Sequence, residues 1–367
     1  MHRMAFGLLI VLALCAFVGP ASAQSPSVLR PAAQSAPSPP SDPPAIRRWF
    51  DLQNVHLMSR FRWVEASDGR LTSSTHQWQP NFRGRVLFDP EARYALHFNA
   101  NSGSQFVSGW NNSGGGIGEF AGDFSLKQLF LAAEPVSGLE FQIGGLHMAR
   151  GENSEITTYD NDAYIVGERV TFRRADGVFS QVAATLGHIG DYRTPNVFRR
   201  LDAMGDINYG QILVGARLGS LSSVSADYTH EDGRDILHEG VTVRMPQSVT
   251  LLRSVKLEAY QRASDVNGQG VALSGDLRFT PRFTATAGLV HVDRHYVIPG
   301  YMSPNADRYE RGTRFYSMGT YQLTRDWSIG WFHGEAFNVD YTIPNEHRWE
   351  MLVTFNPTAT LKAKRIF

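Results

Sequence analysis

The amino-acid sequence predicts an all-β protein: a transmembrane antiparallel up-and-down β-barrel of about sixteen strands, within a range of roughly 14–18. Three observations support this fold class. The chain begins with an export signal, its apolar and polar residues alternate with a period of two from Trp49 to Phe355, and its connecting segments alternate between short and long. We take these features in the order in which they occur along the chain.

Residues 1–23 have the features of a secretory signal peptide. His2 and Arg3 precede an apolar run from Met4 to Val18, and small residues follow up to Ala23, after which we expect cleavage. The apolar run is shorter than the ~20 residues that a membrane-spanning helix needs. The single cysteine of the chain lies inside this segment, so the mature protein is expected to have no disulfide and no cysteine-bound metal.

The composition of the remaining chain narrows the function classes. Lys+Arg and Asp+Glu both number 35, so the formal net charge is zero and nothing indicates a nucleic-acid partner. Residues 24–47 are rich in proline, serine and alanine and are expected to form an extended periplasmic linker. No later stretch is long and apolar enough for a transmembrane helix. The mature chain is therefore either soluble or embedded in a membrane through strands.

From residue 48 onward the pattern is that of strands with one apolar and one polar face. Val55, Leu57, Phe61 and Trp63, for example, share one face of the first expected strand. The same alternation recurs near residues 77–88, 94–101, 125–134, 139–149, 163–174, 179–189, 207–218, 223–231, 236–245, 254–263, 270–279, 283–293, 313–323, 327–337 and 346–355.

The connections between these strands fall into two sets. One set is short, as in Thr280-Pro281-Arg282, and the other is longer, polar and rich in glycine. We place Glu65 to Thr75 and Ser102 to Phe124 in the longer set. Short turns at one end and long loops at the other are typical of outer-membrane barrels.

Over residues 48–355 the chain resembles the general bacterial porin class. The shared features are the signal peptide, the absence of cysteine from the mature chain, the alternating strands, the turn Phe279-Thr280-Pro281-Arg282-Phe283 and a final strand that ends in an aromatic residue. The resemblance implies a location in the outer membrane, contact with its lipid, a channel for small polar solutes, and assembly as a homotrimer. It implies no cofactor and no enzymatic activity.

The last strand leaves two alternatives open. Trp349, Met351, Val353 and Phe355 alternate as a lipid-facing strand should, yet residues 356–367 follow them. Porin-class barrels usually end on a terminal phenylalanine, and this chain does end in Phe367. Residues 356–367 are therefore either a basic tail or one more strand.

Arginine is frequent on the faces that we expect to line the pore. A lumen with more bases than acids favours anions, so we expect an anion preference. The expected pore-lining residues are Arg60, Arg62, Arg83, Arg85, Arg169, Arg173, Arg217, Arg244 and Arg278, joined on the same faces by Lys256, Arg262, Arg314 and Arg348, against the acids Glu140, Asp227, Glu231, Glu258, Asp276 and Glu350.

Other candidate features are weaker. The glycine-rich loop from Ser102 to Phe124, with Trp110, Asn111 and Asn112, is a candidate constriction loop; otherwise it is an external loop. His291, Asp293 and His295 share one face of a strand end and form a weak metal candidate. Ser74 and His76 lie two residues apart without a third member that would suggest a hydrolase.

Two carboxylates do not suit the pattern. Glu168 and Glu239 fall on faces expected to meet lipid, where a charge is costly. We expect a bulge, a shift of register or a position near the membrane surface at these residues.

Two other functions explain part of the pattern. The first is a secreted, soluble all-β binding protein, for instance a carbohydrate-binding sandwich, which would also contain exposed aromatic residues. The second is a barrel that serves as an adhesin or scaffold and has a plugged lumen. Sustained alternation and paired loop lengths favour the channel over the soluble protein.

Overall fold

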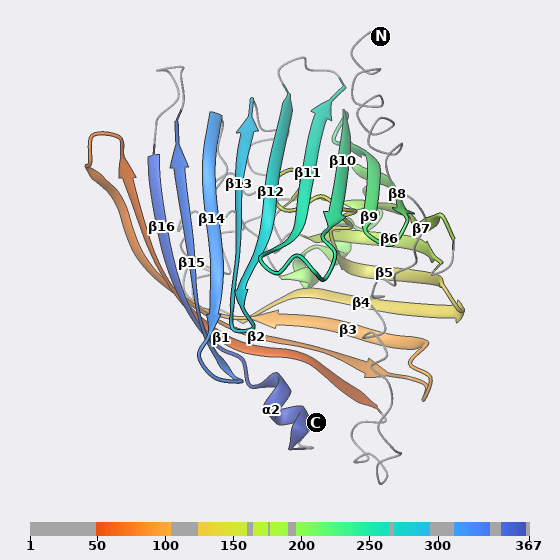
Figure 1. Cartoon of the computed structure of the whole chain (residues 1–367). Helices are drawn as coiled ribbons and strands as arrows, with labels where there is room; N and C mark the ends of the chain where they lie inside the picture. Colours follow the sequence, from red (N-terminus) through yellow and green to blue (C-terminus); the bar gives the residue numbers. More distant parts are fainter. Residues whose placement is uncertain are drawn as a thin grey trace.

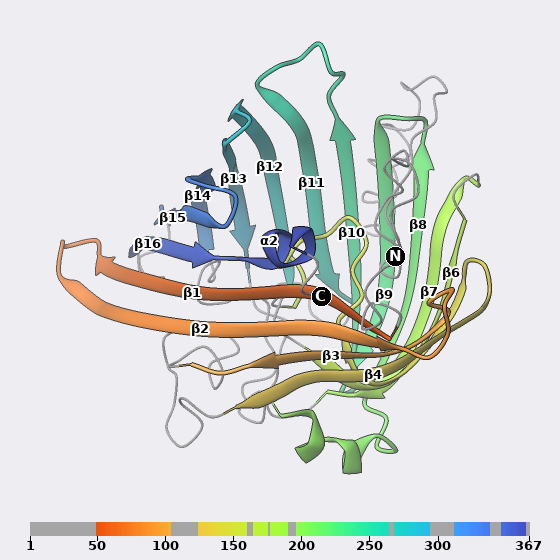
Figure 2. The ribbon, with the colours of Figure 1, turned by 90° about the horizontal axis from the view of Figure 1, so that it is seen from below.

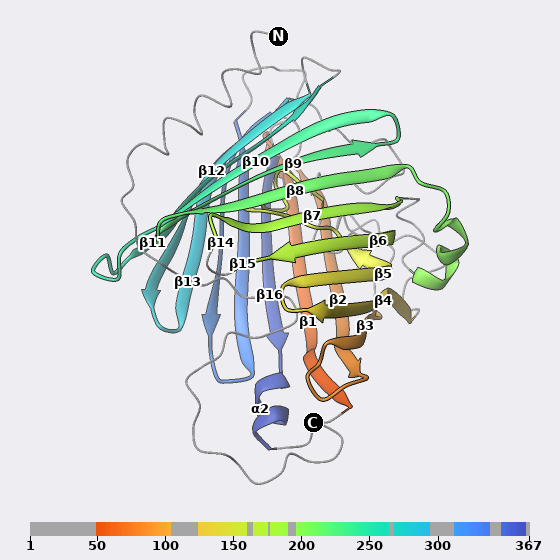
Figure 3. The ribbon, with the colours of Figure 1, turned by 90° about the vertical axis from the view of Figure 1, so that its right-hand side faces the viewer.

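In the computed structural model, the described residues are 49–103, 124–159, 164–174, 177–189, 196–263, 268–293, 312–337 and 346–364. Within them, sixteen antiparallel strands form one closed barrel. Each strand pairs with its neighbours in the sequence, and β16 pairs with β1 to close the ring (Figures 1 and 3). The predicted barrel and its strand number are confirmed.

Most strands contain eight to twelve residues, and the first two are longer, with 17 each. About 9–11 residues suffice for a tilted strand to cross the hydrocarbon layer. The strands are β1 (Phe50–Ala66), β2 (Leu71–Leu87), β3 (Tyr94–Asn101), β4 (Ser125–Val136), β5 (Leu139–His147), β6 (Tyr164–Arg173), β7 (Phe179–His188), β8 (Tyr209–Leu218), β9 (Ser222–Glu231), β10 (Arg234–Arg244), β11 (Leu252–Arg262), β12 (Gln269–Thr280), β13 (Phe283–Val292), β14 (Gly312–Gln322), β15 (Trp327–Ala336) and β16 (Glu346–Phe355).

Polar side chains face the inside of the barrel and apolar ones face outward. On β16, Arg348 and Glu350 are buried, whereas Trp349 and Met351 are 49% and 41% exposed. The same alternation runs through the other strands, and exposed leucine, phenylalanine and tryptophan side chains form a belt around the barrel. We call the two faces the inner wall and the outer wall. An apolar outer wall suits lipid and does not suit the soluble alternative.

The two ends of the barrel differ. At the short-turn end lie tight connections such as Pro281-Arg282, together with the start of β1 and the end of β16 (Figure 1). At the other end, which we call the long-loop end, lie the connections that contain most of the residues outside the described ranges.

Two connections at the long-loop end are also tight. β1 and β2 are joined by Ser67 to Arg70, with Gly69 at φ 80°, so the expected long loop from Glu65 to Thr75 is wrong. β9 and β10 are joined by Asp232 and Gly233, both with positive φ, as a two-residue hairpin requires. The pairing of β1 with β2 continues from Phe50 to Glu65, and this hairpin pairing outweighs the polar composition of residues 71–75.

After β16 the chain forms a short helix, α2 (Thr358–Ala363), at the short-turn end (Figures 1 and 2). Residues 356–364 therefore add no strand, and β16 closes the barrel against β1 from Leu57 to Ala66. Thr358 Oγ1 accepts a hydrogen bond from the Val55 backbone N–H at 2.7 Å. Lys362 Nζ lies 3.2 Å from Asp51 Oδ1. In the described part of the chain, no helix has the length and apolarity to cross a membrane.

The strand register is regular at Glu168 and Glu239, the two carboxylates on faces that were expected to be apolar. Glu168 pairs with Ile143 and Leu186, and Glu239 pairs with Ala226 and Ala259, without a shift at either position. The expected bulge or register shift is therefore wrong. Both carboxylates lie near the middle of their strands and face outward.

Part of the β7–β8 connection lies on the outer wall. It contains two 3-10 helices, η3 (Val197–Arg199) and η4 (Leu201–Ala203). Figure 2 shows this green segment outside the ring of strands, beyond β4. Val197 is buried and occupies the space that a side chain at Gly145 would need.

Candidate functional site: the inner wall and the inward loop

The connection from β5 to β6 enters the barrel, and we call its described residues, 148–159, the inward loop. The Ser154 backbone N–H donates a hydrogen bond to Glu258 Oε2 at 2.6 Å. Ser154 Oγ and Thr157 Oγ1 donate to the same carboxylate, each at 2.7 Å. Glu258 is buried on the inner wall of β11, six strands away from β5. The loop therefore crosses the lumen.

The backbone of the inward loop lies directly against the inner wall. Asn153 Nδ2 donates to the backbone oxygen of Glu239 at 2.9 Å and to that of Ala259 at 3.2 Å. A Cβ at Gly240 would lie 2.9 Å from the Asn153 backbone nitrogen, closer than real Cβ atoms come. Glycine at position 240 is thus what allows the loop to approach β10.

An apolar core lies inside the barrel beneath the inward loop. Ile156 and Tyr159 are buried in the same cluster as Tyr209, Ile236 and Tyr260 of the inner wall. The rings of Tyr159 and Tyr209 meet edge to face with centroids 6.2 Å apart. The Tyr159 hydroxyl also donates a hydrogen bond to Glu231. The inward loop packs against the wall from β8 to β11 and thus fills one side of the lumen. The open part of the lumen therefore lies on the opposite side of its cross-section.

The inward loop is not the segment that the sequence pattern indicated as a constriction. The predicted constriction residues Trp110, Asn111 and Asn112, in the loop from Ser102 to Phe124, lie outside the described residues. A signal for the inward loop is nevertheless present, because Ile156 and Tyr159 interrupt an otherwise polar connection that a purely external loop would not need. The partners Glu258 and Gly240 are far away in the sequence, and only the folded barrel brings them to the loop.

Arginine residues from β1 and β16 meet on one carboxylate of the inner wall. Glu350 lies 3.6 Å from Arg60 Nη1 and 3.2 Å from Arg62 Nε, and it also bonds to Arg348. All four side chains are almost completely buried. The predicted pair Arg60 and Arg62 therefore forms a network that helps to hold the β1–β16 seam together.

The predicted arginines of β2 and β6 differ in how their charges are compensated. Arg85 Nε is 2.9 Å from Asp51 Oδ2, and Arg173 Nη1 is 2.6 Å from Glu140 Oε2. Within the described residues, the hydrogen bonds of Arg169 go to uncharged acceptors, at Thr185, Gln142 and His147.

Arg83 also lies on the inner wall of β2, where it pairs with Asn54 of β1. Within the described ranges it forms no hydrogen bond or ion pair. Of the four predicted arginines on β2 and β6, Arg83 and Arg169 are therefore the two whose charge is not neutralised by a described carboxylate contact.

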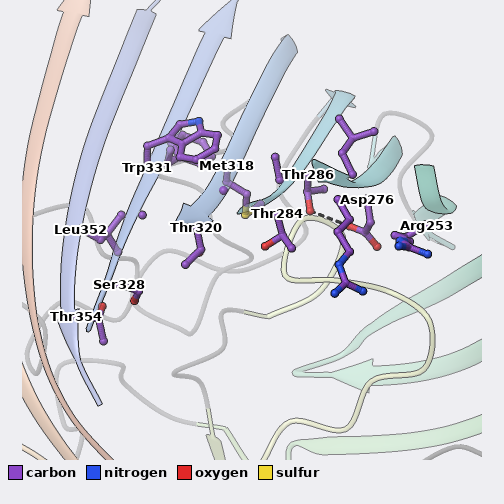
Figure 4. Close-up of a pocket in the computed structure, with 16 residues that line it drawn as sticks. Arg253, Asp276, Thr284, Thr286, Met318, Thr320, Ser328, Trp331, Leu352 and Thr354 are labelled. Atoms are coloured by element: carbon purple, nitrogen blue, oxygen red, sulfur yellow. Dashed lines mark hydrogen bonds between the residues drawn. The ribbon is translucent and has the colours of Figure 1, made fainter. Parts of the chain in front are cut away.

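The remaining predicted arginines, Arg217, Arg244 and Arg278, lie at the short-turn ends of β8, β10 and β12. Arg244 Nη1 is 3.5 Å from Ser223 Oγ. Arg278 lines a cavity of about 570 Å³ on the inner side of β11 to β16 (Figure 4). These arginines are separate from the group on β1, β2 and β16.

The lining of the cavity at the short-turn end mixes apolar residues with several small polar side chains. Figure 4 shows Thr284, Thr286, Thr320, Ser328 and Thr354 around it. Its charged groups are Arg253, Arg278 and Asp276, and Thr286 Oγ1 donates to Asp276 Oδ1 at 2.7 Å. Hydroxyl groups and charged groups of this kind suit a water-filled space.

The weaker candidates take other roles. His291 Nε2 lies 2.7 Å from Asp293 Oδ1, while His295 is outside the described residues. Among the residues that the structure describes, no group of three or more His, Cys, Asp or Glu side chains is arranged to hold a metal. His76 forms its hydrogen bond with Ser59 and not with Ser74.

The geometry defines a class of fold: a closed sixteen-strand antiparallel barrel with an apolar outer wall, a polar inner wall and a loop folded into the lumen. No family model matches the sequence, and no curated protein matches it. Solved structures do resemble it. A variant of the porin of Rhodopseudomonas blastica has 13% identity and a TM-score of 0.52 over 84% of this chain and 99% of that chain. An engineered triple variant of the same porin has 12% identity and a TM-score of 0.53 over the same shares. The chain thus has the fold of porin barrels.

Proposed function

We propose that the protein is an outer-membrane channel for small polar solutes, that it prefers anions, and that it assembles as a homotrimer. The short-turn end, with the start of β1 and with α2, faces the periplasm in this arrangement. The observation that carries the proposal is the inner wall, on which arginines outnumber acids, beside a cavity with several hydroxyl groups and a loop that narrows the lumen. The similarity to porin barrels supports a channel.

Charge inside a water-filled pore selects ions through its electrostatic potential. Arg83 and Arg169 contribute positive charge without a described carboxylate contact, so they leave a net positive potential. Many of the other bases are balanced by acids such as Glu350, Glu140 and Asp51. We therefore expect a moderate preference and not an exclusive selectivity.

The test is the reversal potential of the purified protein in a planar bilayer under a KCl gradient. We expect a sign that reports chloride permeating faster than potassium. Arg83→Gln removes one charge that has no described partner, and we expect the chloride-to-potassium permeability ratio to fall by about two- to threefold. Arg70→Gln, in the exposed β1–β2 turn, is the matched control and should leave the ratio unchanged.

Two results contradict the proposal. A potassium-selective pore would refute the anion preference, and the absence of any conductance from correctly folded protein would favour the scaffold alternative.

A further inference from the structure

Several ionisable side chains face outward near the middle of the outer wall, where most neighbours are apolar, and two of them are His76 on β2 and Glu168 on β6. Groups of this kind are expensive against hydrocarbon, because lipid offers neither hydrogen bonds nor counter-charge. Each therefore points to a partner from outside its own barrel.

Glu168 lies in a hollow of about 390 Å³ on the outer wall of β4, β5 and β6. The hollow is lined by apolar side chains, among them Leu131, Phe141 and Ile143, which are 49%, 43% and 39% exposed. Within the described ranges, the exposed carboxylate of Glu168 has no hydrogen bond and no ion pair. A carboxylate in an apolar hollow is stabilised by a hydrogen-bond donor, and the donor here has to be small enough to enter the hollow.

His76 offers such a donor. Its Nε2 is 2.7 Å from Ser59 Oγ, and its ring stacks on Phe61 with centroids 4.6 Å apart. These two contacts fix the exposed ring and leave Nδ1 without a described partner. Phe61 pairs both with His76 and with Met351, near the middle of β16. His76 is thus close to the level of the barrel middle, as Glu168 is on β6.

The positions of the two groups suit a closed ring of copies. Rotation about an axis along the membrane normal preserves height, so only groups at similar levels can meet between neighbours. β2 and β6 are four strands apart in a barrel of sixteen, about a quarter of the circumference. In a ring of three or four copies, the two contact directions differ by roughly 60–90°. Glu239, on β10, is diametrically opposite β2, and its pairing with His76 would build an open row and not a ring.

The segment with η3 and η4 provides an independent observation on the same wall. Its η3 part lies against β4 and β5, where Val197 packs at Gly145, and the exposed fraction of Phe198 there is 58%. Irregular backbone is not tolerated against lipid unless protein covers it. The wall that contains Glu168 therefore has two features that require protein contact.

We propose that this wall is covered by a second copy of the same chain, and that Glu168 of one copy accepts a hydrogen bond from His76 Nδ1 of the next. The contact joins the outer wall of β1 and β2 to that of β4, β5 and β6. This inference rests on the proposed function, because it names the surface through which the proposed oligomer assembles.

Disulfide cross-linking tests the contact directly. The chain has one cysteine, Cys15, in the expected signal peptide, so introduced cysteines are the only reactive ones in the mature protein. We expect the double variant His76→Cys, Glu168→Cys to give, on oxidation in membranes, a ladder that ends at three or four copies. Each single variant should remain without cross-links. The matched control is His76→Cys with Glu239→Cys, which should give no ladder.

A second experiment tests the polar pair itself. We expect His76→Glu alone to lower the temperature at which the native oligomer dissociates, because two carboxylates then meet. The exchange His76→Glu, Glu168→His should restore that temperature. Heat-modifiable mobility of the monomer confirms that each variant is folded.

An oxidised double variant that stays monomeric, or a ladder of equal intensity in the control pair, would overturn the proposal. Failure of the exchange to restore the dissociation temperature would do the same. These readouts do not depend on conductance, so a pore that proves closed would refute the proposed function and leave the contact intact.

Discussion

At the scale of single residues, polar side chains inside the barrel hold the inward loop in one position. Glu258 accepts three hydrogen bonds from the loop, and Asn153 donates to the backbone of two strands. Hydrogen bonds to a buried carboxylate are strong because they satisfy a charge that would otherwise be desolvated without compensation.

This arrangement predicts the effect of removing the carboxylate. Glu258→Ala should detach Ser154 and Thr157 from β11, at a cost of about 3 kcal/mol in the free energy that holds the loop against the wall. We expect larger current fluctuations in single-channel recordings, because a released loop samples several positions in the lumen. Asp276→Ala removes an acid of the inner wall that does not contact the loop, and it serves as the control. A quiet current in Glu258→Ala, equal to that of the native protein, would show that the loop is held by other contacts.

Glycine positions show what could and could not be read from the sequence at this scale. Gly233 follows Asp232 between two alternating strands, and this local pattern is typical of a hairpin turn. Gly240 has no such local signal, because the atoms that exclude a side chain there belong to Asn153. Its role depends on a contact between distant segments.

At the scale of elements, the alternating pattern predicted the strands well, since one face of every strand meets water or charge and the other meets an apolar surface. Connections were predicted less well. The polar residues 71–75 read as a loop, yet they extend β2, because pairing with β1 supplies their backbone hydrogen bonds. Loops that fold back on the barrel, such as the inward loop, are stabilised by tertiary contacts that a local pattern does not contain.

The C-terminal helix is the element whose role is most directly testable. The described pairing of β1 with β16 begins at Leu57, and α2 places Thr358 on Val55 just beyond it. Arg325 Nη2 also donates to the Ala359 backbone oxygen at 2.7 Å, so α2 links β1 to the β14–β15 turn. An uncovered strand edge exchanges its amide hydrogens readily and invites unwanted pairing.

We therefore expect a chain truncated after Phe355 to form the barrel and to show faster hydrogen exchange in residues 50–56. The paired segment from Leu57 to Ala66 should keep its protection. Thr358→Val is a milder version that removes one acceptor and should raise exchange mainly at Val55. Unchanged exchange at residues 50–56 in the truncated chain would contradict the role assigned to α2.

At the scale of the whole molecule, the electrostatic balance is uneven although the net charge is zero. Arginine gathers on the inner wall, where carboxylates such as Glu350 and Glu140 pair with some of it, while other carboxylates lie in turns and on the outer wall. Bulk composition therefore hides the property that matters for permeation. The alternation of strands made this separation predictable, because it assigns each charge to a face.

The uneven balance predicts how selectivity responds to salt. Screening shortens the reach of fixed charges from about 10 Å at 0.1 M to about 3 Å at 1 M ionic strength. We expect the chloride-to-potassium permeability ratio to approach the ratio of free mobilities as KCl rises over this range. A ratio that does not change with salt would indicate selection by direct contact at a narrow point and not by the potential of the wall.

The pairing of β1 with β16, which closes the barrel, also constrains how the protein folds. Leu57 pairs with Phe355, so the first strand to be synthesised must wait for the last. Contacts between such distant segments form slowly, because the entropy of closing the intervening chain has to be overcome first. Until β16 is available, an exported chain carries apolar faces and unpaired edges with nothing to cover them. Its passage to the membrane therefore depends on being kept from aggregation in the meantime, and a chain interrupted before β16 has no closed form to reach.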